Sequence, residues 1–344
     1  VAAKAEVSRG SLRSLGWGSG ESVSVKGESK VLELLIALAD AGAVAGDLGP
    51  GDDAAVWQPR PGALVVWSTD GVCEDVDFRR RHQTPYQVGW KAWMAAVSDL
   101  SAMGAQPRGG LVALSVPPDT TSLALQAVQL GLVEAAAIDG ATVMGGDLGR
   151  SPGPLSVTVT VAGELIGGAP VQLGGGRAGD DLVVTGTLGL AAAALERLEA
   201  GADGFPGAWR DRLLQPPSRV KAGIALRQAG ASAMTDISDG CLLDLGRICQ
   251  ASGVGADLWL DHLPLAEGLP LAQAQRAALS GGEDFELLAA LPPGHLDRLL
   301  ATWAGDGPGL TSVGTLTGGG QVRVLSGRGG AALEELPDPG FRHF

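Results

Sequence analysis

The chain has 344 residues, of which 45% are hydrophobic and 4% aromatic, and its formal net charge is −13. Only five residues are lysine, so a general nucleic-acid surface, which needs clustered positive charge, is disfavoured. This length allows two domains and a sizeable core of small apolar residues. An acidic protein can still bind phosphates where divalent metals lie between the two sets of anions.

Predicted elements alternate along the first half of the chain. Residues 1–27 are rich in Ser and Gly and lack an apolar signal core, so we expect a flexible leader. Apolar residues three and four apart predict a helix over 30–41, followed by a strand over 62–72. Next we expect a helix, a strand, a helix capped by Thr121 or Ser122, and two strands, over 85–105, 109–117, 121–141, 142–150 and 155–165.

A Gly-rich stretch over residues 167–180 predicts a domain boundary. Beyond it we expect a strand over 181–185, a helix over 188–200, a Pro-bearing connector and further helices and strands. Strands and helices alternate in both halves, which predicts an α/β or α+β fold.

The three cysteines, Cys73, Cys241 and Cys249, form no CxxC pair. This disfavours zinc ribbons and disulfide scaffolds and favours a reducing cytoplasm. No apolar run reaches the length of about 18 residues that a membrane-spanning helix needs, so we expect no such helix.

Several motif matches do not have the context that their function requires. A GxGxxG match at Gly174, Gly176 and Gly179 precedes the strand-like DDLVVTG, whereas a dinucleotide loop opens a helix. A GxSxG match around Ser151 is followed by Pro152 where a nucleophile elbow opens a helix. No Gly-Lys dipeptide occurs, so there is no Walker A loop. The histidines are scattered and predict neither a metal site nor a triad: His82, His262, His295 and His343.

Acidic residues remain at the ends of several predicted elements, each close to Gly or Ser. They are Asp52, Asp53, Asp70, Asp99, Asp147, Asp236, Asp239, Glu283 and Asp284. Singly, such residues are helix caps and turn formers. Carboxylates that converge on one place repel one another unless cations lie between them, and Mg²⁺ prefers oxygen ligands and bridges to phosphate. The pattern therefore indicates a nucleotide polyphosphate held through several Mg²⁺ ions.

In their order these motifs resemble thiamine-monophosphate kinase, a family in the superfamily of aminoimidazole-ribotide synthetase, selenophosphate synthetase and the hydrogenase-maturation dehydratase. The resemblance runs from about Gly27 to Phe344, and SGGEDFEL with the closing GFRHF favours the kinase branch. The motifs are GDD at 51–53, STD at 68–70, VSDLSAMGA at 97–105, GGDLGR at 145–150, GD-x-L-x-VTG at 179–186, DISDG at 236–240 and SGGEDFEL at 280–287.

The resemblance implies a two-domain, aminoimidazole-ribotide synthetase-like α/β (α+β) fold. Residues 28–170 would bind ATP and Mg²⁺ and pair their sheet with a second subunit in a barrel, and residues 171–344 would complete the cleft. The implied reaction is ATP-dependent phosphorylation of thiamine monophosphate to thiamine diphosphate by direct in-line transfer. The implied state is a cytoplasmic homodimer with no nucleic-acid or membrane partner.

The resemblance also assigns roles to single residues. The metal shell would be Asp53, Ser68, Thr69, Asp70, Asp99, Asp147, Asp236 and Asp239. ATP would contact Gly146, Asp147, Arg150 and Ser238, and the substrate would contact Asp77, Glu283 and Phe341. Catalysis would depend on Asp70, Asp99, Asp147, Asp236 and Arg150. Asp77 stands where the family usually has His, so it could meet the thiazolium charge, bind another Mg²⁺ or weaken substrate binding.

The expected nucleophile is an oxygen of the substrate's own phosphate. A phosphomonoester has a second pKa near ~6, so it is largely dianionic at neutral pH and needs no general base. Bridging metals would offset its repulsion from the triphosphate. Within TDISDG, residues 235–240, we expect Ile237 to pack into the second domain. On the helix that follows, we expect Asp244 to be structural and to pair with Arg247.

Two other hypotheses stay open. One is another ATP-dependent enzyme of the superfamily, of the cyclo-ligase or selenophosphate synthetase type. The latter normally carries a reactive Cys or selenocysteine in a Gly-rich N-terminal loop, whereas GWGSGES has Ser19. The other hypothesis is a nucleotide-binding protein with impaired turnover, which Asp77 suggests.

Overall fold

The computed structural model describes residues 8–20, 22, 28–40, 48–202, 206–303 and 307–341. The chain divides into two compact units, Val1–Val97 with Pro107–Ile166, and Ser98–Gln106 with Gly167–Phe344. The second division falls at Ile166/Gly167, four residues before the expected boundary, and the short segment 98–106 groups with the second unit. No helix in the described part of the chain has the length and apolar character needed to cross a membrane.

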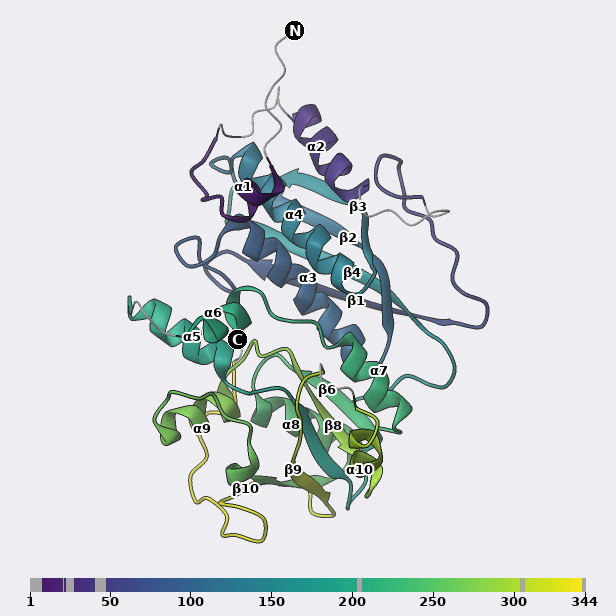
Figure 1. Ribbon diagram of the computed structural model, residues 1–344, viewed down its shortest axis with the longest axis vertical. Coiled ribbons are helices and arrows are strands. Elements are labelled where there is room, and N and C mark those ends of the chain that lie inside the picture. Colours follow the sequence, from purple (N-terminus) through teal and green to yellow (C-terminus); the bar gives the residue numbers. More distant parts are fainter. Residues whose placement is uncertain are drawn as a thin grey trace. The chain divides into compact units, whose positions relative to one another are not determined.

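The first unit is built on a four-stranded sheet in the order β1-β4-β2-β3 (Figure 1). β1 (Leu64–Cys73) pairs antiparallel with β4 (Ser156–Leu165), and β2 (Gln106–Val116) pairs parallel with β3 (Thr142–Arg150). Burial alternates along β2, where Val112 and Leu114 are buried while Leu111 is 40% exposed. One face of the sheet is therefore covered and the other is open.

Helices α3 (Pro85–Ala102) and α4 (Ser122–Ile138) cover the buried face of this sheet (Figure 1). They touch through two glycines, because a Cβ on Gly89 would lie 2.0 Å from the Val128 carbonyl oxygen, and one on Gly131 would lie 2.0 Å from that of Tyr86. The predicted cap of α4 is confirmed, since the Thr121 side chain accepts a hydrogen bond from the Ala124 amide. Helix α2 (Glu28–Asp40) packs on α4 and β3.

The expected flexible leader is wrong for residues 8–20. They include helix α1 (Arg9–Arg13), which packs on α4 and buries Leu12 against Tyr86, Ala127 and Leu130. The prediction failed because it was based on the Ser- and Gly-rich composition. Two apolar side chains in this segment, Leu12 and Trp17, pack against residues that are distant in sequence. Leader residues 1–7, 21 and 23–27 lie outside the described residues, as do His343 and the end of the GFRHF motif.

The second unit is built on a six-stranded sheet in the order β10-β7-β9-β5-β8-β6 (Figure 1). The strands are β5 (Asp181–Thr185), β6 (Ala233–Ile237), β7 (Gly255–Trp259), β8 (Glu286–Leu291), β9 (Leu310–Thr317) and β10 (Val322–Leu325). All pairs are antiparallel except that of β10 with β7.

Helices cover both faces of this sheet, so its central strands are apolar on both sides. Leu182 belongs to a core cluster with side chains of α8 (Cys241–Ser252), and Val183 to one with α7 (Val220–Gln228) and α10 (His295–Leu300). The remaining elements are α5 (Leu190–Glu199), α6 (Gly207–Leu214), α9 (Leu271–Ser280) and a 3₁₀ turn at Leu260–His262.

Candidate active site

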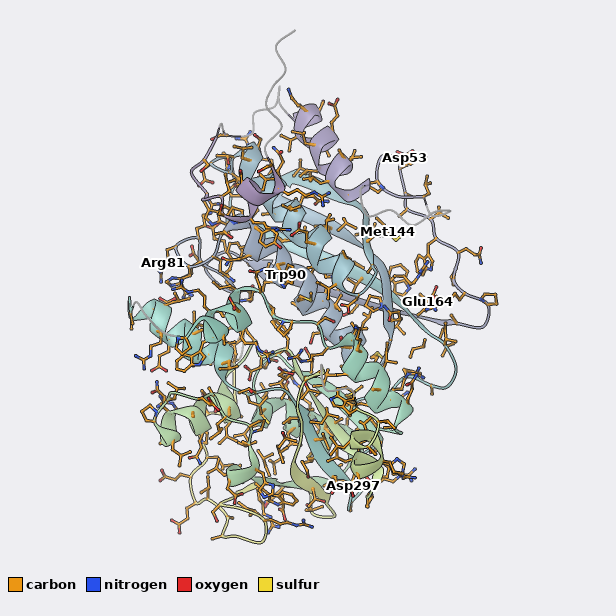
Figure 2. The ribbon with its side chains drawn as sticks, viewed as in Figure 1. Asp53, Arg81, Trp90, Met144, Glu164 and Asp297 are labelled. Carbon is orange, nitrogen blue, oxygen red and sulfur yellow. The ribbon has the colours of Figure 1, made fainter. Side chains whose placement is uncertain are left out.

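In the first unit, the GDD and GGD motifs line the same two adjoining hollows. Both hollows are lined by Asp52, Asp53, Gly146 and Asp147, and Asp53 lies on the loop before β1 (Figure 2). One hollow, of about 410 Å³, has an apolar wall from α2 and the covered side of β2. The other, of about 460 Å³, lies on the open face of the sheet between residues of β1, β2 and β4. Residues far apart in sequence thus form one acidic rim.

The register of β2 and β3 explains the glycine before Asp147. A Cβ on Gly146 would lie 1.8 Å from the carbonyl oxygen of Val112, its partner in the ladder, so only glycine fits. A β-bulge between Gly110 and Leu111 interrupts the pairing just before this point. Close approach of the two strands therefore sets the position of Asp147 at the rim.

A buried carboxylate holds the loop between the GDD motif and β1. Glu164 is only 1% exposed, and it accepts hydrogen bonds from the Arg60 side chain at 2.6 Å and from the Trp57 indole at 3.3 Å (Figure 2 shows its position). Because both donors follow Asp52 and Asp53 on the same loop, Glu164 anchors the loop that carries these acids. Sequence reasoning missed this residue, and its only signal is a lone acid in an apolar strand.

The STD residues of β1 do not line these two hollows. Thr69 pairs across the sheet with Thr160, with 2.9 Å between their hydroxyl oxygens, and the Asp70 side chain accepts from the Gly71 amide at 2.7 Å. Neither hollow is lined by Ser68, Thr69 or Asp70, or by Arg150 at the exposed end of β3. Their metal and ATP roles remain predictions.

Asp77 closes a tight turn directly after β1. Its carboxylate accepts a hydrogen bond from the Cys73 amide at 2.7 Å, and its carbonyl accepts one from the Lys91 ammonium at 2.7 Å. Asp75 between them has a left-handed φ of 67°. One carboxylate oxygen of Asp77 thus has a structural role, and its contact with substrate remains a prediction.

In the second unit, Asp236 is buried at the end of β6 and is 7% exposed. The hydroxyl of Ser98, at the C-terminal part of α3, donates a hydrogen bond of 2.6 Å to it. Burial raises the pKa of the Asp236 carboxyl to about 7, and the negative charge of Asp99 adds to the rise. A cation beside these two acids would favour their charged forms.

Ile237 of the TDISDG motif and Asp244 of the following helix α8 have the structural roles expected of them. Ile237 is fully buried in the core of the second unit, which confirms that prediction. Asp244 pairs with Arg247 at 2.6 Å, also as predicted, and accepts hydrogen bonds from the amides of Asp239 and Gly240. Arg247 reaches the Asp239 carboxylate as well, at 2.5 Å, so Asp239 has a side-chain cation as its partner.

Backbone hydrogen bonds join Glu283 and Phe341, the residues predicted to contact the substrate, to the TDISDG motif. The Glu283 amide donates to the Ser238 carbonyl at 2.8 Å, and the Phe341 amide donates to the Asp239 carbonyl at 2.9 Å. Glu283 has a left-handed φ of 65°, and Phe341 is 49% exposed. The predicted residues Asp236, Ser238, Asp239, Glu283 and Phe341 therefore belong to one region of the second unit.

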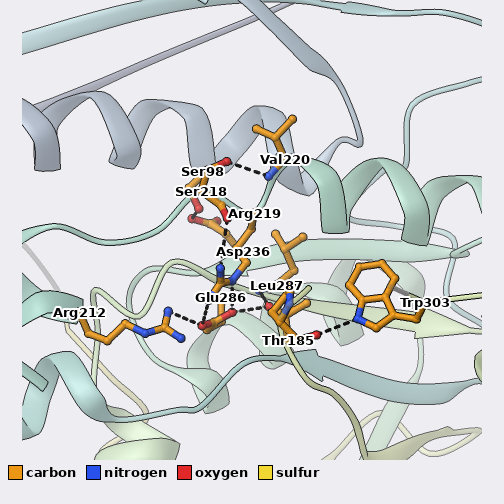
Figure 3. A network of polar contacts seen from close by, with 11 residues as sticks. Ser98, Thr185, Arg212, Ser218, Arg219, Val220, Asp236, Glu286, Leu287 and Trp303 are labelled. Carbon is orange, nitrogen blue, oxygen red and sulfur yellow. Dashed lines mark hydrogen bonds and ion pairs between the residues drawn. The ribbon is translucent and has the colours of Figure 1, made fainter. Parts of the chain in front are cut away.

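Two further acids of SGGEDFEL are structural. Sequence reasoning counted Asp284 among the acidic turns and gave Glu286 no role. Asp284 accepts a hydrogen bond of 2.7 Å from the Gly189 amide at the start of α5, and burial raises the pKa of its carboxyl to about 7. Glu286 is fully buried between Arg212 and Arg219, at 2.6 and 2.5 Å (Figure 3). SGGEDFEL has more acidic residues than a substrate contact needs, and this excess was the sequence signal for buried structural acids.

The residues predicted as metal ligands are divided between the two units. Asp53, Ser68, Thr69, Asp70 and Asp147 belong to the first, and Asp99, Asp236 and Asp239 belong to the second. Across the described residues, no three His, Cys, Asp or Glu side chains are grouped so that they could hold a metal ion. The metal shell therefore stays a prediction.

Comparisons with known proteins identify the family. Residues 51–165 match the model of the AIR synthase related protein, N-terminal domain, and residues 177–326 match that of the C-terminal domain. A thiamine-monophosphate kinase of Mycobacterium tuberculosis is 40% identical over 250 residues, which cover 70% of this chain and 74% of the relative. The crystal structure of thiamine-monophosphate kinase from Stenotrophomonas maltophilia K279a is 34% identical, with a TM-score of 0.78, over 85% of this chain and 95% of that one.

A further structure, named AaThiL complexed with AMPPCP and TMP, is 29% identical to this chain. It has a TM-score of 0.72 and covers 83% of this chain and 89% of that one. The two matched domains, the ordered acidic motifs and the shared fold lead to one conclusion. The chain belongs to the thiamine-monophosphate kinase family of AIR synthase related proteins.

Proposed function

We propose that this protein transfers the terminal phosphoryl group of ATP to thiamine monophosphate, giving thiamine diphosphate and ADP. The observation that carries the proposal is the acidic rim of the first unit, formed by the same motifs that place the chain in its family. Relatives that share 33–40% identity over most of the chain are named thiamine-monophosphate kinase, which favours this reaction over the cyclo-ligase and selenophosphate alternatives.

The hollow of about 410 Å³ supports nucleotide binding in the first unit. Its volume lies within the range of about 300–1,000 Å³ that is usual for small-molecule sites. Its wall carries Leu35, Ile36 and Val143, which suit the flat apolar faces of a base, and its rim carries Asp53 and Asp147. We propose that the base lies against the wall and the phosphates point toward the rim, where Gly146 leaves room for close approach.

Mg²⁺ is the cation that we propose between the acids and the phosphates. It usually keeps several waters and binds one or two carboxylates plus substrate phosphates, rather than a complete cage of side chains. The pairs Asp53 with Asp147 and Asp99 with Asp236 suit this mode, because each offers two carboxylates. When bound, the ion would neutralise the charge of the phosphates. The raised pKa of Asp236 is a cost of its burial that a neighbouring cation would offset.

The chain's own residues would then bind and orient two anions. A phosphomonoester is largely dianionic at neutral pH, so its oxygen needs no general base, and the scattered histidines agree with that. Arg150 would add a positive contact, while Glu283 and Phe341 would contact the thiamine moiety. The aromatic ring of Phe341 is half exposed, as a stacking surface for a heterocycle requires.

A homodimer formed through the open face of the first sheet is also proposed. This face and the edge strand leave large apolar side chains exposed, with Trp67 at 57%, Leu64 at 53% and Leu111 at 40%. Apolar patches of this kind commonly mark interfaces. The three cysteines form no disulfide, which supports a cytoplasmic location.

A direct assay tests the proposed reaction. Purified protein is incubated with thiamine monophosphate, ATP and Mg²⁺, and thiamine diphosphate is measured by chromatography, with Asp147→Asn as the matched variant. We expect product that depends on Mg²⁺ and falls at least about 100-fold in the variant, since a lost charge contact to the reacting phosphates costs a few kcal/mol. ATP binding without any product would instead favour a nucleotide-binding protein with impaired turnover.

A further inference from the structure

An N-terminal segment outside the matched family domains contacts the turn that carries Asp77. This N-terminal segment, residues 8–20, precedes the matched range by 30 residues. The Trp17 ring stacks on that of Phe78, with centroids 6.1 Å apart and planes 12° apart. The Trp17 indole N–H also donates to the Gln83 carbonyl at 2.8 Å. Trp17 therefore touches both ends of the loop 78–83.

Separate contacts hold the N-terminal segment on the first unit. Arg13 forms two hydrogen bonds to Glu134 of α4, at 2.8 and 3.0 Å, and the Tyr86 hydroxyl donates to the same carboxylate at 2.7 Å. Leu12 is 2% exposed in the cluster with Tyr86. These anchors lie on α3 and α4, so the position of Trp17 is set from outside the turn.

An arginine extends the stack across the turn. The Arg80 guanidinium lies over the Trp17 ring, 4.9 Å from its centroid, and donates hydrogen bonds to Glu74 and Asp119 at 2.9 Å. Glu74 lies in the turn over residues 73–78, so the Trp17 ring, the Arg80 guanidinium and Phe78 hold this turn from one side. A cation–aromatic contact and an aromatic pair contribute about 0.5–1.5 kcal/mol each.

We propose that Trp17 is a positioning residue for the substrate-facing turn over residues 73–78. The turn contains a left-handed residue, Asp75, and is held within itself by four short-range hydrogen bonds, so we infer that contacts from outside support its shape. Trp17 supplies that support through Phe78. The inference rests on the proposed function and on the predicted contact of Asp77 with the substrate of that reaction.

Hydrogen exchange and kinetics of the full-length protein test the proposal together. In Trp17→Ala, we expect the amides of residues 73–78 to exchange about two- to tenfold faster. This is the change in the opening equilibrium that corresponds to the loss of one aromatic contact. We expect the KM for thiamine monophosphate to rise by a similar factor, while the KM for ATP stays within about twofold. Trp17→Phe keeps the stacked ring and should stay close to the wild type.

Arg13→Gln is the comparison variant, because it weakens an anchor of the N-terminal segment but leaves the Trp17–Phe78 stack in place. We expect a smaller increase in exchange over 73–78 than in Trp17→Ala. Unchanged exchange over 73–78 in Trp17→Ala would overturn the proposal. Equal increases in the KM values for thiamine monophosphate and ATP, together with a lower Tm, would also overturn it. That result would indicate that Trp17 stabilises the whole fold rather than the turn. If the wild type makes no thiamine diphosphate, the proposed function fails, and the exchange rates alone decide whether Trp17 holds the turn.

Discussion

Ser98 and Asp236 are 138 residues apart in the chain, and their side chains meet in a buried hydrogen bond of 2.6 Å. Ser98 lies in the VSDLSAMGA motif directly before Asp99, and Asp236 opens DISDG. The bond therefore joins two of the motifs on which the resemblance to the family rests. It also gives a buried carboxylate one of the donors that it needs in the absence of water.

Ser98→Ala should destabilise the protein and impair its reaction. The change removes the Ser98 donor from the buried Asp236 carboxylate, which costs about 1–3 kcal/mol in the free energy of unfolding. Because the carboxylate also loses its fixed orientation, we expect kcat/KM to fall by more than the loss of folded protein accounts for. Denaturant unfolding and the kinase assay measure the two effects. Ser326→Ala, an exposed serine of the same unit, is the control and should change neither.

Gly146→Ala should damage the acidic rim. The new Cβ would lie 1.8 Å from the Val112 carbonyl oxygen, so β2 and β3 must separate. We expect a loss of at least about 2 kcal/mol in stability, and weaker ATP binding measured by calorimetry. Gly149→Ala in the same strand meets nothing closer than 3.7 Å and should behave as the wild type. Equal behaviour of the two variants would contradict the role of close strand approach.

Glu286→Gln should be among the most destabilising single changes in the second unit. It leaves Arg219, which is 8% exposed, without its anion, and breaking a buried ion pair from one side costs about 3–5 kcal/mol. Asp257→Asn removes the partner of Arg323, a side chain that is 54% exposed, and should cost much less. Urea denaturation of both variants makes the comparison, and a similar loss in the two would show that burial does not matter here.

Asp284 should make the ligand-free protein less stable as the pH rises. Burial raises the pKa of its carboxyl from 3.8 to about 7 in the folded state, so the folded protein holds a proton that the unfolded chain has lost. Between about pH 4 and pH 7 this group therefore lowers the free energy of unfolding, by up to about 1.4 kcal/mol per pH unit.

Asp284→Asn tests this pH dependence directly. The amide oxygen can still accept the hydrogen bond from Gly189, while the titration is removed. We expect a flatter profile of unfolding free energy from pH 5 to pH 8, and a gain over the wild type at pH 8. An identical slope in the two proteins would mean that Asp284 is not the group that titrates.

Much of the fold and part of the site could be predicted from local pattern. Apolar spacing predicted α2 and α4, and alternation predicted β4. Thr121 as a cap and the Asp244–Arg247 pair were also predictable, because both depend on spacing within one helix. Leu12 and Trp17 were missed since a Ser- and Gly-rich segment carries no periodic signal.

The sequence by itself determined the order of the elements, the positions of the acidic turns and the family, because these depend on residue types at short spacing. Only the tertiary structure showed which acidic side chains have buried structural partners. It buried Glu286 between two arginines, gave Asp236 its donor in Ser98 and laid Trp17 on Phe78. Such contacts join residues that are tens to hundreds of positions apart, and packing rather than local propensity selects them.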